Sequence, residues 1–176
     1  MNREQLKEFG WLALAKFKEP LAVHGFKRES KKTETYFCTI VFVNGTRYIK
    51  IDANIHFRDY PPYFNIVLGE GGRDFFEVDW NSIPLWRLKS HIQRNEPGSE
   101  YSLEFPENIP ALIDQACKEL LEFGSGFLNG DLEAFRQARV EQNKSRPAYK
   151  VYAPNEDGKY TVYDEPESVK MKTKYS

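Results

Sequence analysis

The chain has two cysteines, almost no net charge and no long apolar run. Nothing in its 176 residues approaches the roughly 18 consecutive apolar residues of a membrane span, and its charged N-terminal segment lacks the apolar stretch of a signal peptide. We therefore expect a cytoplasmic protein with no membrane partner. Since 25 basic residues balance 26 acidic ones, no overall field attracts phosphate backbones, which disfavours a generic nucleic-acid binder.

Residues that carry metal or thiol chemistry are also scarce. Cys38 and Cys117 lie far apart within apolar patterns, which indicates two buried thiols in a reducing compartment rather than a disulfide. The histidines show neither ligand spacing nor a neighbouring cysteine; they are His24, His56 and His91. We expect no metal site and no cofactor.

The N-terminal segment has the apolar periodicity of an amphipathic helix from Asn2 to about Val23. Pro20 falls inside this pattern, so the helix either kinks there or ends and restarts, and Gly25 is placed to stop it. A basic run then predicts a solvated loop: Lys27, Arg28, Lys31 and Lys32.

A β-hairpin is the clearest local signal. Asn44-Gly45, between two β-rich runs, predicts a two-residue turn that pairs Val43 with Thr46. One face is then apolar and forms the core: Tyr36, Cys38, Ile40, Phe42, Ile49, Ile51, Ala53, Ile55 and Phe57. The other face combines apolar and polar side chains, and it is either partly exposed to solvent or covered by another element. Its residues are Phe37, Thr39, Val41, Tyr48, Lys50, Asp52, Asn54 and His56.

The rest of the chain predicts a sheet followed by helices and an appended hairpin. Strands are expected at 63–68, 75–80 and 100–105, while 82–88 fits either a short helix or an edge strand. Helices are expected at 109–123 and 131–143, a hairpin at 148–164, and frayed residues from 165 onward.

These elements together predict an α+β fold. We expect an antiparallel sheet of four to six strands, with helices packed on one face and an extra C-terminal hairpin. The division of the chain is a domain at 1–145 and an appended hairpin with a polar tail at 146–176.

One row of polar residues suggests catalysis. Asp52, Asn54 and His56 recur at steps of two on the non-core side of one strand, about 6.6 Å apart. An acid, an amide and an imidazole in this arrangement suit general acid–base chemistry, as in a small hydrolase or nuclease. The alternative, which we favour, is the solvent side of an amphipathic strand.

Aromatic residues are abundant, with 13 Phe, 10 Tyr and 3 Trp. Tyrosine and tryptophan dominate protein interfaces, because they offer large contact area at little entropic cost. Candidate binding residues are Trp80, Trp86, Tyr149, Tyr152, Tyr160 and Tyr163. Core packing is an equal alternative for the tryptophans. The tail tyrosines favour an interface, with another protein or by self-association, because a two-stranded hairpin rarely has a core to fill.

The segment Leu21-Ala-Val-His-Gly-Phe-Lys-Arg28, with the later run Tyr63-Phe-Asn-Ile-Val-Leu-Gly69, resembles small bacterial α+β domains of unknown function. Some similar domains serve as immunity proteins beside polymorphic toxins. The resemblance covers at most residues 6–70 and carries over no catalytic or binding residue. The resemblance implies an inhibitor or other binding protein. We therefore expect non-catalytic protein binding, and a small hydrolase or nuclease that uses Asp52 and His56 is the alternative.

Overall fold

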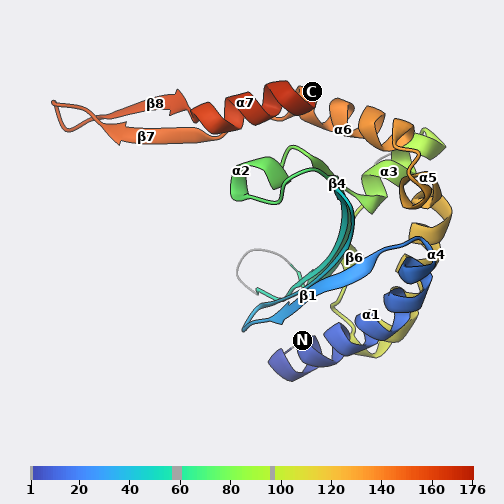
Figure 1. The fold of residues 1–176 in the computed structure, drawn as a ribbon. Helices are drawn as coiled ribbons and strands as arrows, with labels where there is room; N and C mark the ends of the chain where they lie inside the picture. The colour runs from blue at the N-terminus through green and yellow to red at the C-terminus, as the bar shows by residue number, and fades with distance from the viewer. Residues whose placement is uncertain (1, 57–60, 96–97) are drawn as a thin grey trace.

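The computed structural model describes residues 2–56, 61–95 and 98–176 and shows an α+β fold (Figure 1). A six-stranded antiparallel sheet runs in the order β1-β2-β3-β4-β5, and β6 pairs with β4. Its strands are β1 (Lys27–Thr33), β2 (Phe37–Asn44), β3 (Arg47–Asn54), β4 (Tyr63–Glu70), β5 (Ser82–Pro84) and β6 (Tyr101–Ser102). A separate hairpin consists of β7 (Lys150–Pro154) and β8 (Tyr160–Asp164).

The helices come before, between and after the strands. They are α1 (Arg3–Val23), α2 (Phe75–Val78), α3 (Leu85–Gln93), α4 (Ile109–Phe123), α5 (Ser125–Asn129), α6 (Glu133–Ser145) and α7 (Pro166–Tyr175), with a 3-10 turn at Pro106–Asn108. No helix in the described ranges is long and apolar enough to cross a bilayer.

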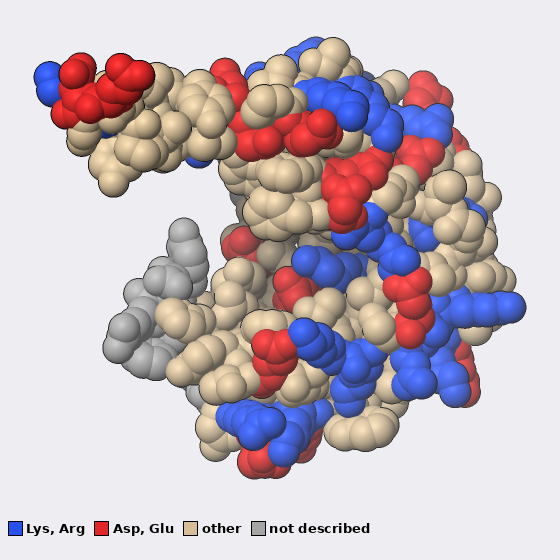
Figure 2. Space-filling view, turned by 60° about the vertical axis from the view of Figure 1, so that its left-hand side comes forward, with Lys and Arg blue, Asp and Glu red and all other residues tan. Residues whose placement is uncertain are grey.

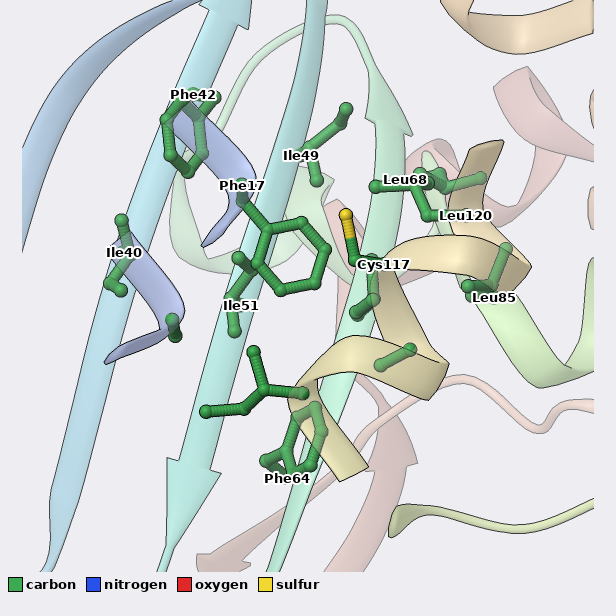
Figure 3. Close-up of a cluster of buried hydrophobic side chains, with 14 of the residues drawn as sticks. Phe17, Ile40, Phe42, Ile49, Ile51, Phe64, Leu68, Leu85, Cys117 and Leu120 are labelled. Atoms are coloured by element: carbon green, nitrogen blue, oxygen red, sulfur yellow. The ribbon is translucent and has the colours of Figure 1, made fainter. Parts of the chain in front are cut away.

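The sheet is strongly curved, and α1 and α4 lie along its convex side (Figure 1). Alternate strand residues point to this side and are buried against the helices, as period-two alternation requires. Figure 3 shows the Phe17 ring of α1 between Cys117 of α4 and Ile51 of the sheet in this core. The predicted core of the central hairpin is therefore confirmed, except that Tyr36 is 42% exposed and Phe57 lies outside the described residues.

Helix α1 has clear start and stop signals. Asn2 and Gln5 form a reciprocal capping box at its N-terminus. The helix continues through Pro20 and ends at Val23, and Gly25, two residues later, has a φ of 78°, in the left-handed region. The Phe26 and Gly25 amides donate to the Leu21 and Ala22 carbonyls, which completes the C-terminal cap.

The central hairpin has a different register from the expected one. Asn44 pairs with Arg47, so Gly45-Thr46 forms the turn, and Ile40 pairs with Ile51. Gly45 has a φ of 60°, as the first position of a type II′ turn requires, whereas Asn44 is extended as the last residue of β2. The error of two residues leaves every side chain on its expected face, because the side-chain period is two.

The predicted basic loop was wrong. The run from Lys27 to Lys32 forms most of edge strand β1, which pairs with β2 and has a bulge between Arg28 and Ser30. Backbone hydrogen bonds to β2 stabilise this strand, because its side chains are mostly exposed and show no apolar alternation.

The middle of the chain corrects two further expectations. The strand expected at 75–80 is wrong, because helix α2 forms at Phe75–Val78 and a turn follows it. Asp74 caps this helix by accepting a hydrogen bond from the Glu77 amide at 2.9 Å. The ambiguous segment at 82–88 contains both alternatives, with β5 followed at once by α3. The strand expected at 100–105 shrinks to the two residues of β6.

The C-terminal helices extend the prediction. Helices α4 and α6 confirm the two expected periodic segments, and α5 between them was missed. The terminal hairpin is confirmed, but the residues after it are not frayed, because they form α7. Tyr175 is 8% exposed and Ser168 is fully buried, so α7 is anchored to the body of the protein.

This anchor is a buried carboxylate. Glu77 of α2 accepts hydrogen bonds from the Tyr175 hydroxyl and from Lys174 Nζ, the latter at 2.7 Å. On the other side of α7, Asn143 Nδ2 donates to the Tyr175 carbonyl at 2.9 Å. The hydrogen bonds from Lys174 and Tyr175 hold the pKa of the Glu77 carboxyl below its usual 4.5.

A Glu77→Gln variant should therefore have a flatter acid limb in its stability profile. Because the folded-state pKa is depressed, the ionised carboxylate stabilises the fold above pH 4.5, and this contribution is lost as pH falls through the folded pKa. Thermal melts between about pH 3 and pH 7 should show a lower Tm for the variant at neutral pH and a smaller drop toward acid. Glu156→Gln, at the exposed hairpin tip, is the control and should follow the wild type. Parallel curves for Glu77→Gln and wild type would contradict the anchor.

Candidate functional site

The concave face of the sheet is hollowed and is not sealed at its centre. Its central positions are all half-buried, neither sealed by a helix nor fully in solvent: Thr39, Val41, Lys50, Asp52, Asn65 and Val67. Figure 2 shows a hollow in this region in which acidic and basic side chains are interspersed. The sequence assigns the first four of these residues to the non-core face. We call the six residues the concave face.

In the structure, Asp52, Asn54 and His56 each contact neighbouring residues. Asp52 accepts a hydrogen bond from Thr39 at 2.5 Å and lies 3.3 Å from Lys50 Nζ. The Asn54 side chain accepts from the His56 backbone amide at 2.8 Å, and the His56 ring lies edge-on to Tyr36 with centroids 5.0 Å apart. Local partners thus engage each member of the row.

A cavity of about 490 Å³ opens where the concave face meets α2, α3 and α6. Its apolar floor includes Val67 and Pro84, and its charged lining includes Lys50, Arg87 and Arg146. Asp79 also lines it, and this carboxylate accepts a hydrogen bond from the Tyr149 hydroxyl and lies 3.3 Å from Arg146. The cavity is therefore more basic than the chain as a whole, and none of Asp52, Asn54 and His56 lines it.

Two aromatic side chains of α2 and Tyr149, just before β7, form a lip beside this cavity. Phe75 and Tyr149 stack with ring centroids 6.0 Å apart, and Phe76 meets Phe75 edge-on at 5.1 Å. Phe75 is 71% exposed. We call Phe75, Phe76 and Tyr149 the aromatic lip. An exposed phenylalanine held in place by two other rings has the character of an interface anchor.

The two candidate tryptophans have different environments. Trp80 is 1% exposed and belongs to the core, with the Arg146 guanidinium 5.2 Å from its ring. Trp86 is half-buried and lines the cavity, and Arg87 lies 4.8 Å from the Trp86 ring. Of the two, Trp86 alone is placed to contact a molecule in the cavity.

The four candidate tyrosines of the tail lie in two different places. Tyr149 belongs to the aromatic lip, whereas Tyr152, Tyr160 and Tyr163 lie on the projecting hairpin and are 64%, 70% and 46% exposed. Figure 1 shows this hairpin leading away from the body on the same side as α2. We call the hairpin, Lys150–Asp164, the arm.

The cysteines and histidines form no reactive centre in the part of the chain that the structure describes. Both thiols are buried, and burial raises the pKa of Cys38 and of Cys117, which disfavours the reactive thiolate. His24 contacts Asn129 and His91 contacts Glu141, each at 2.9 Å. No group of three or more potential metal ligands occurs among the described residues.

The aromatic lip is not predicted from the sequence, because the apolar run that includes Phe75 and Phe76 indicates a strand. A signal was present, since Asp74 followed three residues later by Glu77 fits the pattern of a helix N-terminus. That pattern predicts a helical turn with Phe75 at its first position, outside any sheet.

Comparison of the chain with protein-family models, with curated proteins and with solved structures gives no match. The geometry of the site therefore carries the functional argument.

Proposed function

We propose that this is a cytoplasmic, non-catalytic protein of the immunity type, which binds and inhibits another protein at its concave face. The observation that carries the proposal is the aromatic lip beside an uncovered sheet face, with Phe75 71% exposed. A large exposed aromatic next to a half-buried mixed surface is the usual composition of a protein interface.

The charge of the cavity indicates the chemistry of the bound segment. Lys50, Arg87 and Arg146 line it, and the Asp79 carboxylate in its wall is already paired with Arg146. An acidic side chain on the target would find compensating charge there, while a basic one would meet repulsion. We infer that the target presents an acidic residue flanked by an apolar one, the latter against the aromatic lip.

The alternative function, a hydrolase or nuclease that uses Asp52 and His56, has less support. The Asp52 carboxylate already accepts a hydrogen bond from Thr39 and forms an ion pair with Lys50. Neither Asp52 nor His56 lines the cavity. Turnover of a phosphoester, ester or nucleotide panel that disappears in His56→Ala at unchanged Tm would favour this alternative over inhibition.

Substitution of Phe75 in the aromatic lip should weaken binding while the fold is kept. We expect Phe75→Asp to weaken the complex at least tenfold, because it removes a desolvated anchor of the interface. Phe105→Asp is the matched control, since Phe105 is 60% exposed in the connection from β6 to α4. The measurement is titration calorimetry against the product of a neighbouring toxin gene, together with rescue of cells that express it.

Two results would contradict the proposal. One is equal loss of affinity in Phe75→Asp and Phe105→Asp. The other is a purified neighbouring toxin that this protein neither binds nor neutralises.

A further inference from the structure

The arm leaves one strand edge open. All five residues of β8 are exposed, and β8 pairs only with β7 in the described structure. A two-stranded hairpin is marginally stable by itself in water. We therefore expect that, in the functional form of the protein, another polypeptide segment covers the open edge of β8.

The backbone hydrogen bonds show which groups of β8 are free to pair. The Asn155 amide donates to the Lys159 carbonyl and the Glu165 amide to the Tyr149 carbonyl, each at 2.7 Å. Because inward and outward groups alternate along a strand, Thr161 and Tyr163 also turn their amides and carbonyls toward β7. The backbone groups of Tyr160, Val162 and Asp164 consequently point outward from the hairpin.

Other edges of the protein carry features that block pairing, and β8 does not. Edge strand β1 has exposed basic residues and a bulge between Arg28 and Ser30. The free edge of β7 carries Lys150 at one end and Pro154 at the other. Strand β8, Tyr-Thr-Val-Tyr-Asp, has no lysine, no proline and no register shift, and it is rich in residues that favour strands. This edge is suited to accept another strand.

We propose that β8 pairs antiparallel with β8 of a second copy, about a two-fold axis at Val162. This register brings Val162 opposite Val162 and Tyr160 opposite Asp164 of the other copy. The outward backbone groups then meet one another on every paired residue. One four-stranded sheet results, and neither copy keeps an open β8 edge.

A second copy fits this edge because β8 is complementary to itself. The two-fold at Val162 keeps the Asp164 carboxylates apart, whereas like charges directly opposite would be unfavourable. Tyr152 lies opposite Val162, and Pro154 opposite Tyr160, so these four side chains share one face of the arm. The symmetric pair joins two such faces into one apolar surface.

The proposal is independent of the inhibitor function. The arms run in opposite directions, so the two bodies and their concave faces lie at opposite ends of the paired sheet. The contact is limited to the arms, which places it among small, weak interfaces, and we expect a dissociation constant of about 1–100 µM.

Disulfide trapping tests the register. In a hydrogen-bonded antiparallel pair the Cα atoms lie about 5.5 Å apart, within the range that a disulfide spans. Val162→Cys should therefore form a covalent dimer under mild oxidation. Tyr160→Cys is the control, because the two substituted residues would be separated by four positions, about 13 Å along the strand. The native cysteines are buried and should not interfere. Failure of Val162→Cys to cross-link, or equal cross-linking of both variants, would overturn the proposed pairing.

Sedimentation velocity tests the association without a cross-link. The wild type should shift from monomer to dimer between about 1 and 300 µM. Val162→Pro should remain monomeric, since it removes an outward amide that the hairpin does not use, while Val162→Thr keeps the amide and should still dimerise. A wild type that stays monomeric throughout, or a Val162→Pro variant that dimerises normally, would overturn the proposal.

Discussion

An Ile51→Asp variant should be unfolded or nearly so at room temperature. Ile51 is fully buried, and it pairs with Ile40 on one side and Ile66 on the other beneath the helices. A carboxylate at this position loses its water without gaining a partner, which costs about 4 kcal/mol or more of the free energy of unfolding. Circular dichroism during urea titration would measure this loss.

The adjacent residue supplies the control. Lys50 lies on the opposite face, half-buried, with Asp52 3.3 Å away. Lys50→Ala should change the free energy of unfolding by less than about 1 kcal/mol, because partly exposed ion pairs contribute little. A larger cost for Lys50→Ala than for Ile51→Asp would invert the assignment of the two faces.

Truncation after Ser145 should destabilise the fold strongly, whereas removal of the arm alone should not. The truncation deletes α7 and with it the contacts of Tyr175 to Glu77 and to Asn143. We expect Tm to fall by more than about 8 °C, which for a domain of this size corresponds to over 2 kcal/mol. Differential scanning calorimetry would measure the difference.

Excision of Lys150–Asp164 separates the arm from the anchor. The Glu165 amide donates to the Tyr149 carbonyl at 2.7 Å, so a two-glycine link joins these residues without moving α7. This variant should melt within a few degrees of the wild type and sediment as a monomer. If it instead melts as low as the truncated chain, the arm itself belongs to the stabilising core.

The faces of the sheet could be read from the sequence because they depend only on parity. An error of two residues at the Gly45 turn changed every pairing of the central hairpin and moved no side chain to the other face. The exact register depends on turn conformation, and both Asn44-Gly45 and Gly45-Thr46 are compatible with a two-residue turn.

Elements stabilised by long-range contacts were harder to predict. Strand β1 forms on the backbone of β2 despite its charged side chains, and α7 forms although Ser168 and Tyr175 are its only buried residues. Neither has a strong apolar period. Their stability comes from partners distant in the sequence, such as Glu77 for Tyr175.

Only part of the candidate site could be predicted, because alternation assigns a residue to a face of the sheet and does not say what packs against it. Alternation assigned Lys50 and Asp52 to the non-core side, where the structure places them. Residue type alone could not distinguish Trp80 in the core from Trp86 in the cavity wall, because both roles suit a large amphipathic ring. The exposure of Phe75 depends on the cap at Asp74, which turns the chain out of the sheet.

The packing of α1 beside α4 has a consequence for synthesis on the ribosome. The Cys117 thiol of α4 lies 3.9 Å from the Lys16 carbonyl of α1, across 101 positions of the chain. When strands β1 to β4 have emerged, the convex apolar face of the sheet is therefore still without helix α4. We expect nascent chains that stall before Ile109 to expose this face and to need chaperone protection, until translation of α4 closes the core.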